Sequence, residues 1–452
     1  MNGERARSTI VAVATPPGKG AIAIVRASGP AVDTIRRVMI AGAAGLRPRT
    51  ATYVTVRDDT GRPLDRALAL YFPAAQSYTG EEMLELHLHG SPIVARDVTL
   101  AMMACGARLA GPGEFTQRAF LNGKIALREA VAIADLIDAQ TSAAARAALA
   151  NFDSALAREA GTMREAIAEI VTHLEASIDF PDEVPEPQRA PLLQRLEPIR
   201  ARLGQLRSDG EFGRLLREGL AVAIVGPPNA GKSSLLNALL GTERAIVSEI
   251  PGTTRDTIEE SIAIDGVPVR LVDTAGIRAH AGRIEAEGMT RSIAALDAAA
   301  LAIVVLDGSV ELGASGRDLL DRTARRPRVV LVNKADLGLS PATLAAVPDA
   351  IAGSVRDAAT IETVRTSIAS AGWAAQPADL AQPQFSALHE LEAISDAIAA
   401  IDHARDALQR GDPMDFAAGE LQSAFSALGH VSERAAAEEI VTRIFARFCI
   451  GK

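Results

Sequence analysis

The chain is poor in aromatic residues and in cysteine, and it lacks long apolar runs. Aromatic residues make up 3% of the 452 residues, and Cys105 and Cys449 are the only cysteines. Two cysteines cannot build a disulfide framework or a cysteine-rich metal site, so a reducing compartment is expected. No stretch of about eighteen apolar residues occurs, so no membrane span is expected. Because the first residues do not resemble a signal peptide, we expect a cytoplasmic protein.

The chain has an excess of acidic residues, with a formal net charge of −9. A protein that binds nucleic acid over its whole surface needs clustered lysine and arginine, so this balance leaves room only for a local basic patch. Hydrophobic content of 48% and charged content of 23% are ordinary for a soluble protein. The length predicts about three domains.

A glycine-rich loop follows a short apolar run. Residues 220–225 are typical of a buried parallel strand, and Gly226, Gly231, Lys232 and Ser233 follow in the spacing GxxxxGK[ST]. The glycines allow successive backbone N–H groups to point at one anion. Lys232 can reach the outer phosphates, Ser233 can bind Mg²⁺, and the next helix contributes its N-terminal dipole. The pattern predicts a phosphate-binding loop.

Two further motifs can complete a metal and γ-phosphate site. Thr254, in the segment 251–256, can join the Mg²⁺ coordination when a γ-phosphate is present. Asp273-Thr274-Ala275-Gly276 follows an apolar strand, and it brings a carboxylate near the metal and a glycine N–H near the γ-phosphate. The order of these motifs after the phosphate loop favours nucleoside triphosphate hydrolysis.

The last two motifs concern the base. Asn333-Lys334-Ala335-Asp336 follows another strand, and Asp336 can accept hydrogen bonds from N1–H and the 2-amino group of guanine. Adenine lacks that edge, so GTP is predicted over ATP. The loop Ser354-Val355-Arg356, after Gly353, is a poor match to the usual base-contacting loop.

Four regions are expected from the pattern of apolar residues. Residues 1–120 are mixed α/β, 121–216 are helical, 217–374 alternate strands with helices, and 375–452 return to helical periodicity and could complete a bundle. Strands are predicted at 10–13, 21–26, 52–56, 67–72, 83–89, 221–225, 261–264, 269–273, 302–307, 329–333 and 350–353. Long helices are predicted at 126–140, 142–178 and 191–207.

Three polar, glycine-containing segments in the first region are either binding loops or ordinary turns. They are residues 14–21, 77–87 and 111–118. His87 and His89 share one strand face, and without a third ligand nearby they are expected to be structural rather than metal ligands.

Together these motifs resemble the MnmE (TrmE) family of bacterial tRNA-modification GTPases over nearly the whole chain. The matching segments are Ala14-Thr-Pro-Pro-Gly-Lys-Gly20, Ser77-Tyr-Thr-Gly-Glu81, Gly111-Pro-Gly-Glu-Phe115, Arg118-Ala-Phe-Leu-Asn122, Ala134-Asp-Leu-Ile-Asp138, Asp179-Phe-Pro-Asp182, Gly252-Thr-Thr-Arg-Asp256 and Phe448-Cys-Ile-Gly-Lys452. The resemblance implies a Ras-like P-loop G domain, a parallel sheet with helices on both faces, inserted in an α-helical bundle. A small α+β folate-binding domain, which also forms the homodimer, precedes it.

The resemblance also implies the residues of the G domain. Ile277 stands where a water-orienting glutamine often lies, and Glu285 would take that role beside Lys232 and Thr254. The family is potassium-dependent, and K⁺ would bind Asn229 and backbone carbonyls of Ser248, Ile250 and Thr253. The nucleotide and K⁺ residues would be Asn229, Ala230, Gly231, Lys232, Ser233, Ser234, Ser248, Ile250, Thr253, Thr254, Asp273, Thr274, Ala275, Gly276, Asn333, Lys334, Asp336, Ser354, Val355 and Arg356.

Four residues match the family's tetrahydrofolate contacts: Arg26, Glu85, Lys124 and Lys452. The ligand would be 5,10-methylenetetrahydrofolate or 5-formyltetrahydrofolate, with a carboxylate suited to the pterin edge and cations suited to the glutamate tail. Cys449 would lie near that pocket, either as a reactive thiol or as a small buried hydrophobe.

By resemblance, the protein hydrolyses GTP to drive addition of a carboxymethylaminomethyl or aminomethyl group to C5 of the wobble uridine of certain tRNAs. It would act in a heterotetramer with the FAD-dependent partner MnmG (GidA). Two alternatives are a ribosome-assembly GTPase of the Era-like kind and a scaffold that binds GTP without hydrolysing it. The region 1–120 and the ending Phe-Cys-Ile-Gly-Lys distinguish the first, and GTP turnover distinguishes the second.

Overall fold

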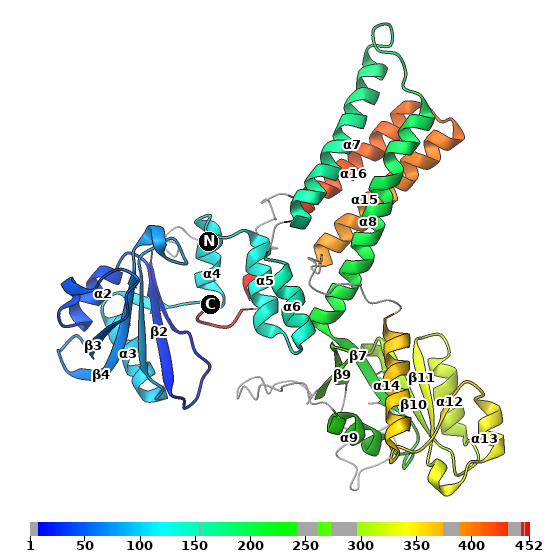
Figure 1. Ribbon diagram of the computed structural model, residues 1–452, viewed down its shortest axis with the longest axis horizontal. Helices are drawn as coiled ribbons and strands as arrows, with labels where there is room; N and C mark the ends of the chain where they lie inside the picture. The colour runs from blue at the N-terminus through cyan, green and yellow to red at the C-terminus, as the bar shows by residue number, and fades with distance from the viewer. Residues whose placement is uncertain are drawn as a thin grey trace. The chain divides into compact units, whose positions relative to one another are not determined.

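The computed structural model describes residues 8–152, 155–242, 260–272, 296–373, 385, 388–432, 444–446 and 448–452. Contacts divide the chain into two compact units (Figure 1), Met1–Ala134 with Arg434–Lys452, and Asp135–Glu433. Among the described residues, no helix is both long and apolar enough to cross a membrane. The four-part division expected from the sequence stays a prediction.

The N-terminal unit is built on a six-stranded sheet in the order β3-β4-β5-β2-β1-β6. Its strands are β1 (Thr9–Val13), β2 (Ile22–Ser28), β3 (Thr52–Arg57), β4 (Pro63–Phe72), β5 (Met83–His89) and β6 (Ala107–Leu109). All neighbours are antiparallel except β1 and β6, which are parallel. The five predicted strands are confirmed, whereas the three-residue β6 was not expected because it is too short to show an alternating pattern.

One face of this sheet is covered by helices α2 (Val32–Met39) and α3 (Pro92–Ala104). Alternate strand residues such as Val25, Leu84 and Leu86 are fully buried in the core that these helices complete. Since side chains alternate along a strand, their neighbours Arg26 and Glu85 lie on the opposite face. Helix α4 (Glu114–Leu121) contributes Phe115 to a small cluster with Ile10 and Ala12.

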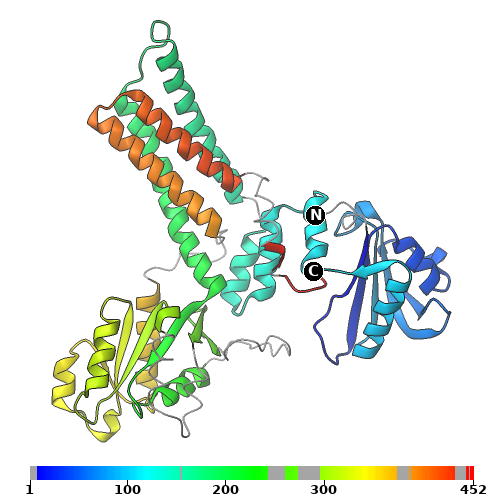
Figure 2. The same cartoon turned by 180° about the vertical axis from the view of Figure 1, so that it is seen from behind.

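The last residues of the chain join the N-terminal unit. Pro112 and Ile450 form a β-bridge, and the N–H of Phe115 donates to the carbonyl of Lys452 at 3.1 Å. Phe445 and Phe448 pack against α5 (Leu127–Asp138), and the segment lies beside that helix in both views (Figures 1 and 2). This docking places Lys452 on the N-terminal sheet despite its distance along the chain.

Four long helices of the second unit form a bundle with one apolar core. They are α7 (Ala155–Asp179), α8 (Arg189–Glu218), α15 (Leu388–Arg410) and α16 (Met414–Ser432). The C-terminal helices thus complete the bundle begun before the G domain, as predicted.

The single helix predicted at 142–178 is wrong, because α6 (Ser142–Ala150) ends before α7 begins. Thr141 caps α6 by accepting from the Ala144 N–H, and Asn151 lies at its C-terminal end. The apolar period continues through both helices, so periodicity did not reveal the break.

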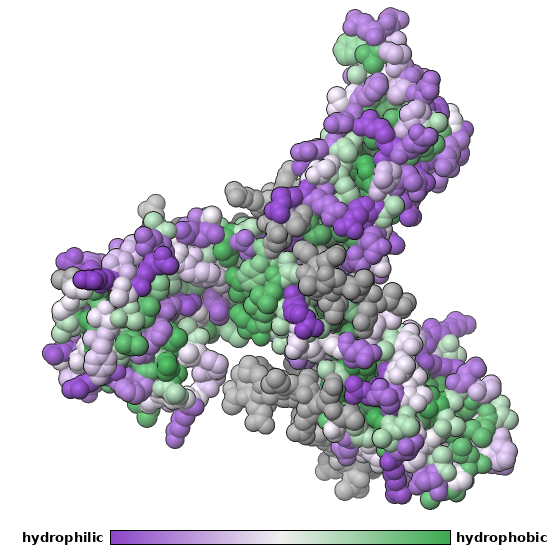
Figure 3. Space-filling view, viewed as in Figure 1, coloured by the Kyte–Doolittle hydropathy of each residue, from purple (hydrophilic) through white to green (hydrophobic). Residues whose placement is uncertain are grey.

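Figure 3 shows hydrophobic residues gathered over α5 and α6, where Ile137 and Leu149 are 46% and 54% exposed.

The G domain is a six-stranded sheet in the order β12-β11-β10-β7-β9-β8. Its strands are β7 (Leu220–Val225), β8 (Glu260–Ile264), β9 (Val267–Val272), β10 (Leu301–Asp307), β11 (Arg328–Asn333) and β12 (Ile351–Ala352). All neighbours are parallel except the β8–β9 hairpin. Its helices within the described ranges are α9 (Lys232–Thr242), α12 (Ala314–Thr323), α13 (Pro341–Ala346) and α14 (Ala358–Gly372).

The central strand β10 is buried along six consecutive residues, as a strand covered on both faces must be. Residues of α9 and α14 lie in the core on one face, and Leu319 of α12 lies in the core on the other. The expected doubly covered parallel sheet is confirmed.

Candidate functional site

The phosphate loop begins where β7 ends, and its glycines are required by their neighbours. A Cβ at Gly226 would lie 2.2 Å from the Val305 carbonyl oxygen, and one at Gly231 would lie 2.1 Å from Asn333 Nδ2. Gly231 has φ +107° and Asn229 has φ +61°, so both have left-handed backbone conformations. The loop therefore has the tight curvature that an anion-binding backbone needs.

Lys232 is the first residue of α9 and is half-buried. Its Nζ donates to the carbonyls of Gly226 and Pro227, each at 2.8 Å. Burial lowers the pKa of Lys232, because desolvation disfavours the ammonium. An incoming phosphate would supply the negative charge that two neutral carbonyls cannot. Ser233 and Ser234 are exposed beside it, at the N-terminal end of the same helix.

Asn333 connects the phosphate loop to the base loop. Its Nδ2 donates to the carbonyl of Ala230 at 2.8 Å, and its Oδ1 accepts from the N–H of Val355 at 3.0 Å. Asn333 is buried and is the last residue of β11. One amide thus fixes the spacing between the loop that would hold phosphates and the loop that would hold guanine.

Asp336 lies beside the loop 354–356, whose sequence is a poor match to the usual base-contacting loop. Its Oδ1 accepts from Ser354 Oγ at 2.8 Å, and its Oδ2 accepts from Arg356 at 3.1 Å. The hydrogen bond from Ser354 is the main cause that lowers the pKa of Asp336, so the carboxylate remains an acceptor at neutral pH. The structure therefore brings Asn333, Asp336 and the 354–356 loop together.

Several sequence-predicted residues lie outside the described residues, and the structure does not place them. They are Ser248, Ile250, Thr253, Thr254, Asp273, Thr274, Ala275, Gly276, Ile277 and Glu285.

A second group of charged side chains lies on the N-terminal sheet. Arg26 and Glu85 face each other across β2 and β5, with Nε donating to Oε1 at 2.7 Å. The guanidinium lies 5.7 Å from the Phe115 ring centroid. Burial lowers the pKa of Lys452, and repulsion from Arg26 adds to the shift while attraction to Glu85 opposes it. Lys452, Arg26 and Glu85 therefore share one electrostatic environment.

Lys124, the fourth sequence-predicted residue of this group, is exposed just after α4. Its Nζ donates to the carbonyl of Ala75 at 2.9 Å, and its aliphatic chain lies against Gly80. Its backbone N–H donates to the carbonyl of Ala119, so the end of α4 fixes its position. Lys124 borders the loop 75–80 rather than the Arg26–Glu85 pair.

A buried ion-pair network that the sequence analysis did not identify supports α4. Arg118, which is 3% exposed, donates to Glu81 and Glu114, and Arg108 donates to Glu114. Burial alone would raise the pKa of Glu114, but hydrogen bonds from Arg108, the Gly111 N–H and Arg118 outweigh it and lower the pKa to about 2. The sequence signals were the polar segments 77–87, which contains Glu81, and 111–118, which contains Glu114 and Arg118.

A large cavity of the N-terminal unit is not lined by Arg26, Glu85 or Lys452. Its volume is about 810 Å³, and it lies between the segment 12–23 and α3, with Ile450 at its rim. Four of its lining residues, Ile22, Leu100, Leu109 and Ile450, are 55–60% exposed. Such a group of exposed apolar residues is typical of an interaction surface.

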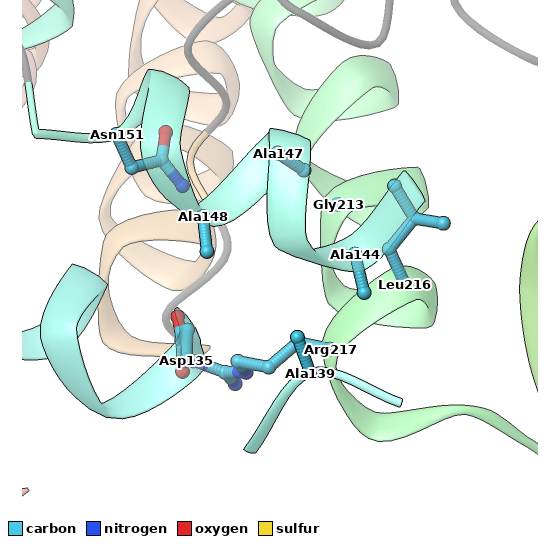
Figure 4. A pocket seen from close by; sticks show the side chains of 9 residues that line it. All are labelled: Asp135, Ala139, Ala144, Ala147, Ala148, Asn151, Gly213, Leu216 and Arg217. Atoms are coloured by element: carbon cyan, nitrogen blue, oxygen red, sulfur yellow. The ribbon is translucent and has the colours of Figure 1, made fainter. Parts of the chain in front are cut away.

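A much smaller cavity lies in the second unit, with room for about one water molecule at about 20 Å³. It is lined by Asp135, Ala139, Ala144, Ala147, Ala148, Asn151, Gly213, Leu216 and Arg217, and Figure 4 shows Arg217 and Asp135 pointing toward one another. Its size excludes it as a substrate site.

The two histidines of β5 have carboxylate neighbours. His87 Nε2 lies 3.3 Å from Glu85 Oε2, and His89 Nδ1 lies 2.8 Å from Asp65 Oδ1. Within the described ranges, no cluster of three or more His, Cys, Asp or Glu residues could hold a metal ion.

Two family models match the chain. The family described as GTP-binding protein TrmE N-terminus matches residues 9–124, and the MnmE helical domain matches residues 127–449.

Among curated relatives, the tRNA modification GTPase MnmE of Xanthomonas campestris pv. campestris (strain B100) is 42% identical, covering 98% of this chain and 99% of the relative. The protein of the same name from Akkermansia muciniphila is 40% identical with the same coverage.

Among solved structures, the G domain of the T. maritima FeoB iron transporter is 23% identical and covers 34% of this chain and 98% of its own, with a TM-score of 0.25. A single-residue variant of Aquifex aeolicus Era bound to GDP and AlF4⁻ is 24% identical and covers 40% of this chain and 65% of its own, with a TM-score of 0.26. These scores are too low to carry an argument, and the fold rests on the sheet topology. The two family models and the full-length identities show that the chain belongs to the MnmE family of tRNA modification GTPases.

Proposed function

We propose that the protein hydrolyses GTP to drive addition of a carboxymethylaminomethyl or aminomethyl group to C5 of the wobble uridine of certain tRNAs. The observation that carries the nucleotide part is the pair of hydrogen bonds made by Asn333, to Ala230 and from Val355. They hold the phosphate loop, residues 226–233, and the loop 354–356 at a fixed separation. Asp336, with its pKa lowered, is an acceptor for the guanine edge.

In this proposal Lys232 moves from its two carbonyl partners to the β- and γ-phosphates. Ser233 would hold Mg²⁺ together with Thr254, and Glu285 would orient the attacking water. K⁺ would bind the Asn229 side chain and the carbonyls of Ser248, Ile250 and Thr253, where its charge stabilises the transferred phosphoryl group. The exposed position of Asn229 at the outer bend of the loop is consistent with a cation there.

We assign Arg26, Glu85 and Lys452, with Lys124 at the margin, to a 5,10-methylenetetrahydrofolate or 5-formyltetrahydrofolate site. Glu85 can accept from a pterin edge, and Arg26 and Lys452 are two cations near one carboxylate, which leaves positive charge for a glutamate tail. Cys449 is exposed in the same terminal segment.

For partners, we propose a homodimer that joins two copies of the FAD-dependent MnmG. The exposed apolar residues around the large cavity of the N-terminal unit support a second copy of this chain as the first partner. The flavin would belong to MnmG, and tRNA would be bound by the complex.

Nucleoside analysis of tRNA from cells that lack this gene tests the main proposal. We expect the wobble-uridine modification to disappear and to return with the wild-type gene but not with Lys232→Ala. Unaltered wobble uridine in the deletion strain would refute the proposal. GTP binding without turnover would instead support the scaffold alternative.

Potassium dependence has its own test. Because Asn229 has φ +61°, Asn229→Gly removes the side-chain oxygen without backbone strain. We expect wild-type GTP hydrolysis to be faster in KCl than in NaCl, and the variant to lose that difference. Equal rates of GTP hydrolysis by the wild type in KCl and NaCl would contradict a role for K⁺ in catalysis.

A further inference from the structure

The turn that follows β10 directly contacts the loop 333–336, which would bind guanine. The N–H of Gly308 donates to the carbonyl of Asn333 at 2.8 Å, and the N–H of Ser340 donates to the carbonyl of Gly308 at 2.7 Å. A Cβ at Gly308 would lie 2.7 Å from the Asn333 carbonyl oxygen, so glycine is needed for this approach. No sequence motif assigned a role to Asp307 or to the turn Gly308-Ser309 that follows it.

Asp307, the last residue of β10 before the turn, is paired with Lys334. Its Oδ2 lies 2.6 Å from Lys334 Nζ, and its Oδ1 accepts from the Ser309 N–H and hydroxyl at 3.0 and 2.6 Å. The two charged side chains are 21% and 26% exposed, so solvent only partly screens the pair. Burial raises the pKa of Asp307, but the bonds from Lys334 and Ser309 outweigh it and lower the pKa, so the carboxylate is charged at neutral pH.

Lys334 has an unusual backbone conformation. Its φ is +67° and its ψ is +34°, in the left-handed region that is costly for a residue with a side chain. Lys334 lies between two residues of the proposed guanine site. The Asn333 side chain is bonded to Ala230 and Val355, and Asp336 would accept hydrogen bonds from the base. The left-handed turn therefore sets the direction of Asp336 relative to Asn333, and a partner that holds Lys334 stabilises the turn.

We propose that Asp307 is a positioning residue for guanine-nucleotide binding, acting through its ion pair with Lys334 to hold the Asn333–Asp336 loop in its left-handed turn. The proposal rests on the proposed guanine-binding role of that loop. Asp307 does not touch the nucleotide. Asp307 contributes to the binding of the guanine base, which GTP and GDP share, and does not contribute to phosphoryl transfer.

The test uses the full-length protein with Asp307→Asn, a fluorescent GDP analogue for binding and steady-state GTP hydrolysis. We expect binding of GDP and GTP to weaken alike, by about five- to tenfold, with kcat at saturating GTP within about twofold of the wild type. Asp307→Glu keeps the charge and should bind within about twofold of the wild type, because the flexible lysine can follow the longer side chain. Ser309→Ala, which leaves the ion pair intact, is the matched control. GDP binding by Asp307→Asn that equals wild-type binding would overturn the proposal.

A double-mutant cycle with Lys334→Met shows whether Asp307 acts through Lys334. The variant with both changes should bind GDP no more weakly than Lys334→Met alone, whereas two independent, multiplying losses would contradict the proposal. If Asp307→Asn does not fold, as judged by Trp373 emission without nucleotide, Lys334→Met carries the test because it breaks the same pair. Unchanged GDP binding by that variant overturns the proposal. A wild-type protein that does not bind GDP would instead refute the guanine site itself.

Discussion

The two sheets of this protein carry their charged side chains in different places. In the G domain, β10 is buried on both faces, so polar groups gather at the carboxyl ends of the strands, in loops such as 226–233 and 333–336. In the N-terminal unit, β5 alternates buried and part-exposed residues, so Arg26 and Glu85 lie on the sheet face opposite the α2–α3 core, with 19% and 14% of their side chains exposed.

This difference decides how each site is encoded. A loop at a strand end is a run of consecutive residues, so its residues are adjacent in the sequence as a motif. A site on a sheet face combines single residues from β2, β5 and the end of the chain. The loops at the strand ends depend on backbone geometry, whereas the site on the sheet face depends on side-chain electrostatics. Single substitutions can therefore test the two kinds of site separately.

The largest effect is expected at Gly226 of the phosphate loop. Gly226→Ala would bring a methyl group to 2.2 Å from the Val305 carbonyl oxygen and displace the loop. We expect GTP hydrolysis to fall by at least about a hundredfold, the loss typical of a displacement of about 1 Å in a reactive geometry. Gly241→Ala in the following helix meets no atom within 4 Å and should be nearly neutral. Equal activity of the two variants would show that the loop backbone can adapt.

The next effect concerns acid stability of the N-terminal unit. The pKa of Glu114 is about 2 in the folded protein against 4.5 as a model value, so its contribution is complete above about pH 4.5 and is lost as pH falls toward 2. We expect a loss of roughly 2 kcal/mol across that window, with the partial exposure of Arg108 reducing the full linkage value.

The sequence supplies separate reporters for this measurement. The three tyrosines, Tyr53, Tyr71 and Tyr78, lie in the N-terminal unit, and the single tryptophan, Trp373, lies in the other. Tyrosine emission should therefore show the acid transition of the N-terminal unit. Glu114→Gln should be less stable at neutral pH and should lose most of the dependence between pH 4.5 and 2. An unchanged acid profile in Glu114→Gln would assign the transition to other groups.

A smaller effect is expected at the Arg26–Glu85 pair of the N-terminal sheet. Glu85→Gln removes the charge that pairs with Arg26, and we expect binding of 5-formyltetrahydrofolate to weaken by about tenfold, as for loss of one charged hydrogen bond. Calorimetric titration of the full-length protein measures it. Glu82→Gln, which keeps an acceptor for the Tyr71 hydroxyl, is the control. Equal affinities for both variants would place the folate elsewhere, with the 810 Å³ cavity as the next candidate.

The smallest effect is expected at Lys124. Its side chain is exposed and donates to the carbonyl of Ala75 rather than to the Arg26–Glu85 pair. Lys124→Met should weaken folate binding by only about two- to threefold, because an exposed cation is screened by water and salt. The loss should shrink as salt is raised in the same titration. A loss as large as that of Glu85→Gln would show that ligand binding brings Lys124 into the charged group.

The sequence predicted most of the fold where a pattern is local. Strands of the N-terminal sheet appeared as alternating residues, and those of the G domain appeared as short continuous apolar runs. The break between α6 and α7 was missed, because apolar residues recur at helical spacing in the segments on both sides of it. The Glu114–Arg118 network was also missed, because a charged helix residue looks the same in a sequence whether it is buried or exposed.

The phosphate loop, the preference for guanine and the family could all be predicted from the sequence, because each depends on consecutive residues whose backbone or hydrogen-bonding chemistry has few alternatives. Three contacts are visible only in the three-dimensional structure: Asn333 joins two loops, Asp307 pairs with Lys334, and the Lys452 carbonyl accepts from the Phe115 N–H. The physical reason is that these contacts depend on strand order and on the docking of the last residues at Pro112 and Phe115. Neither leaves a local pattern in the chain.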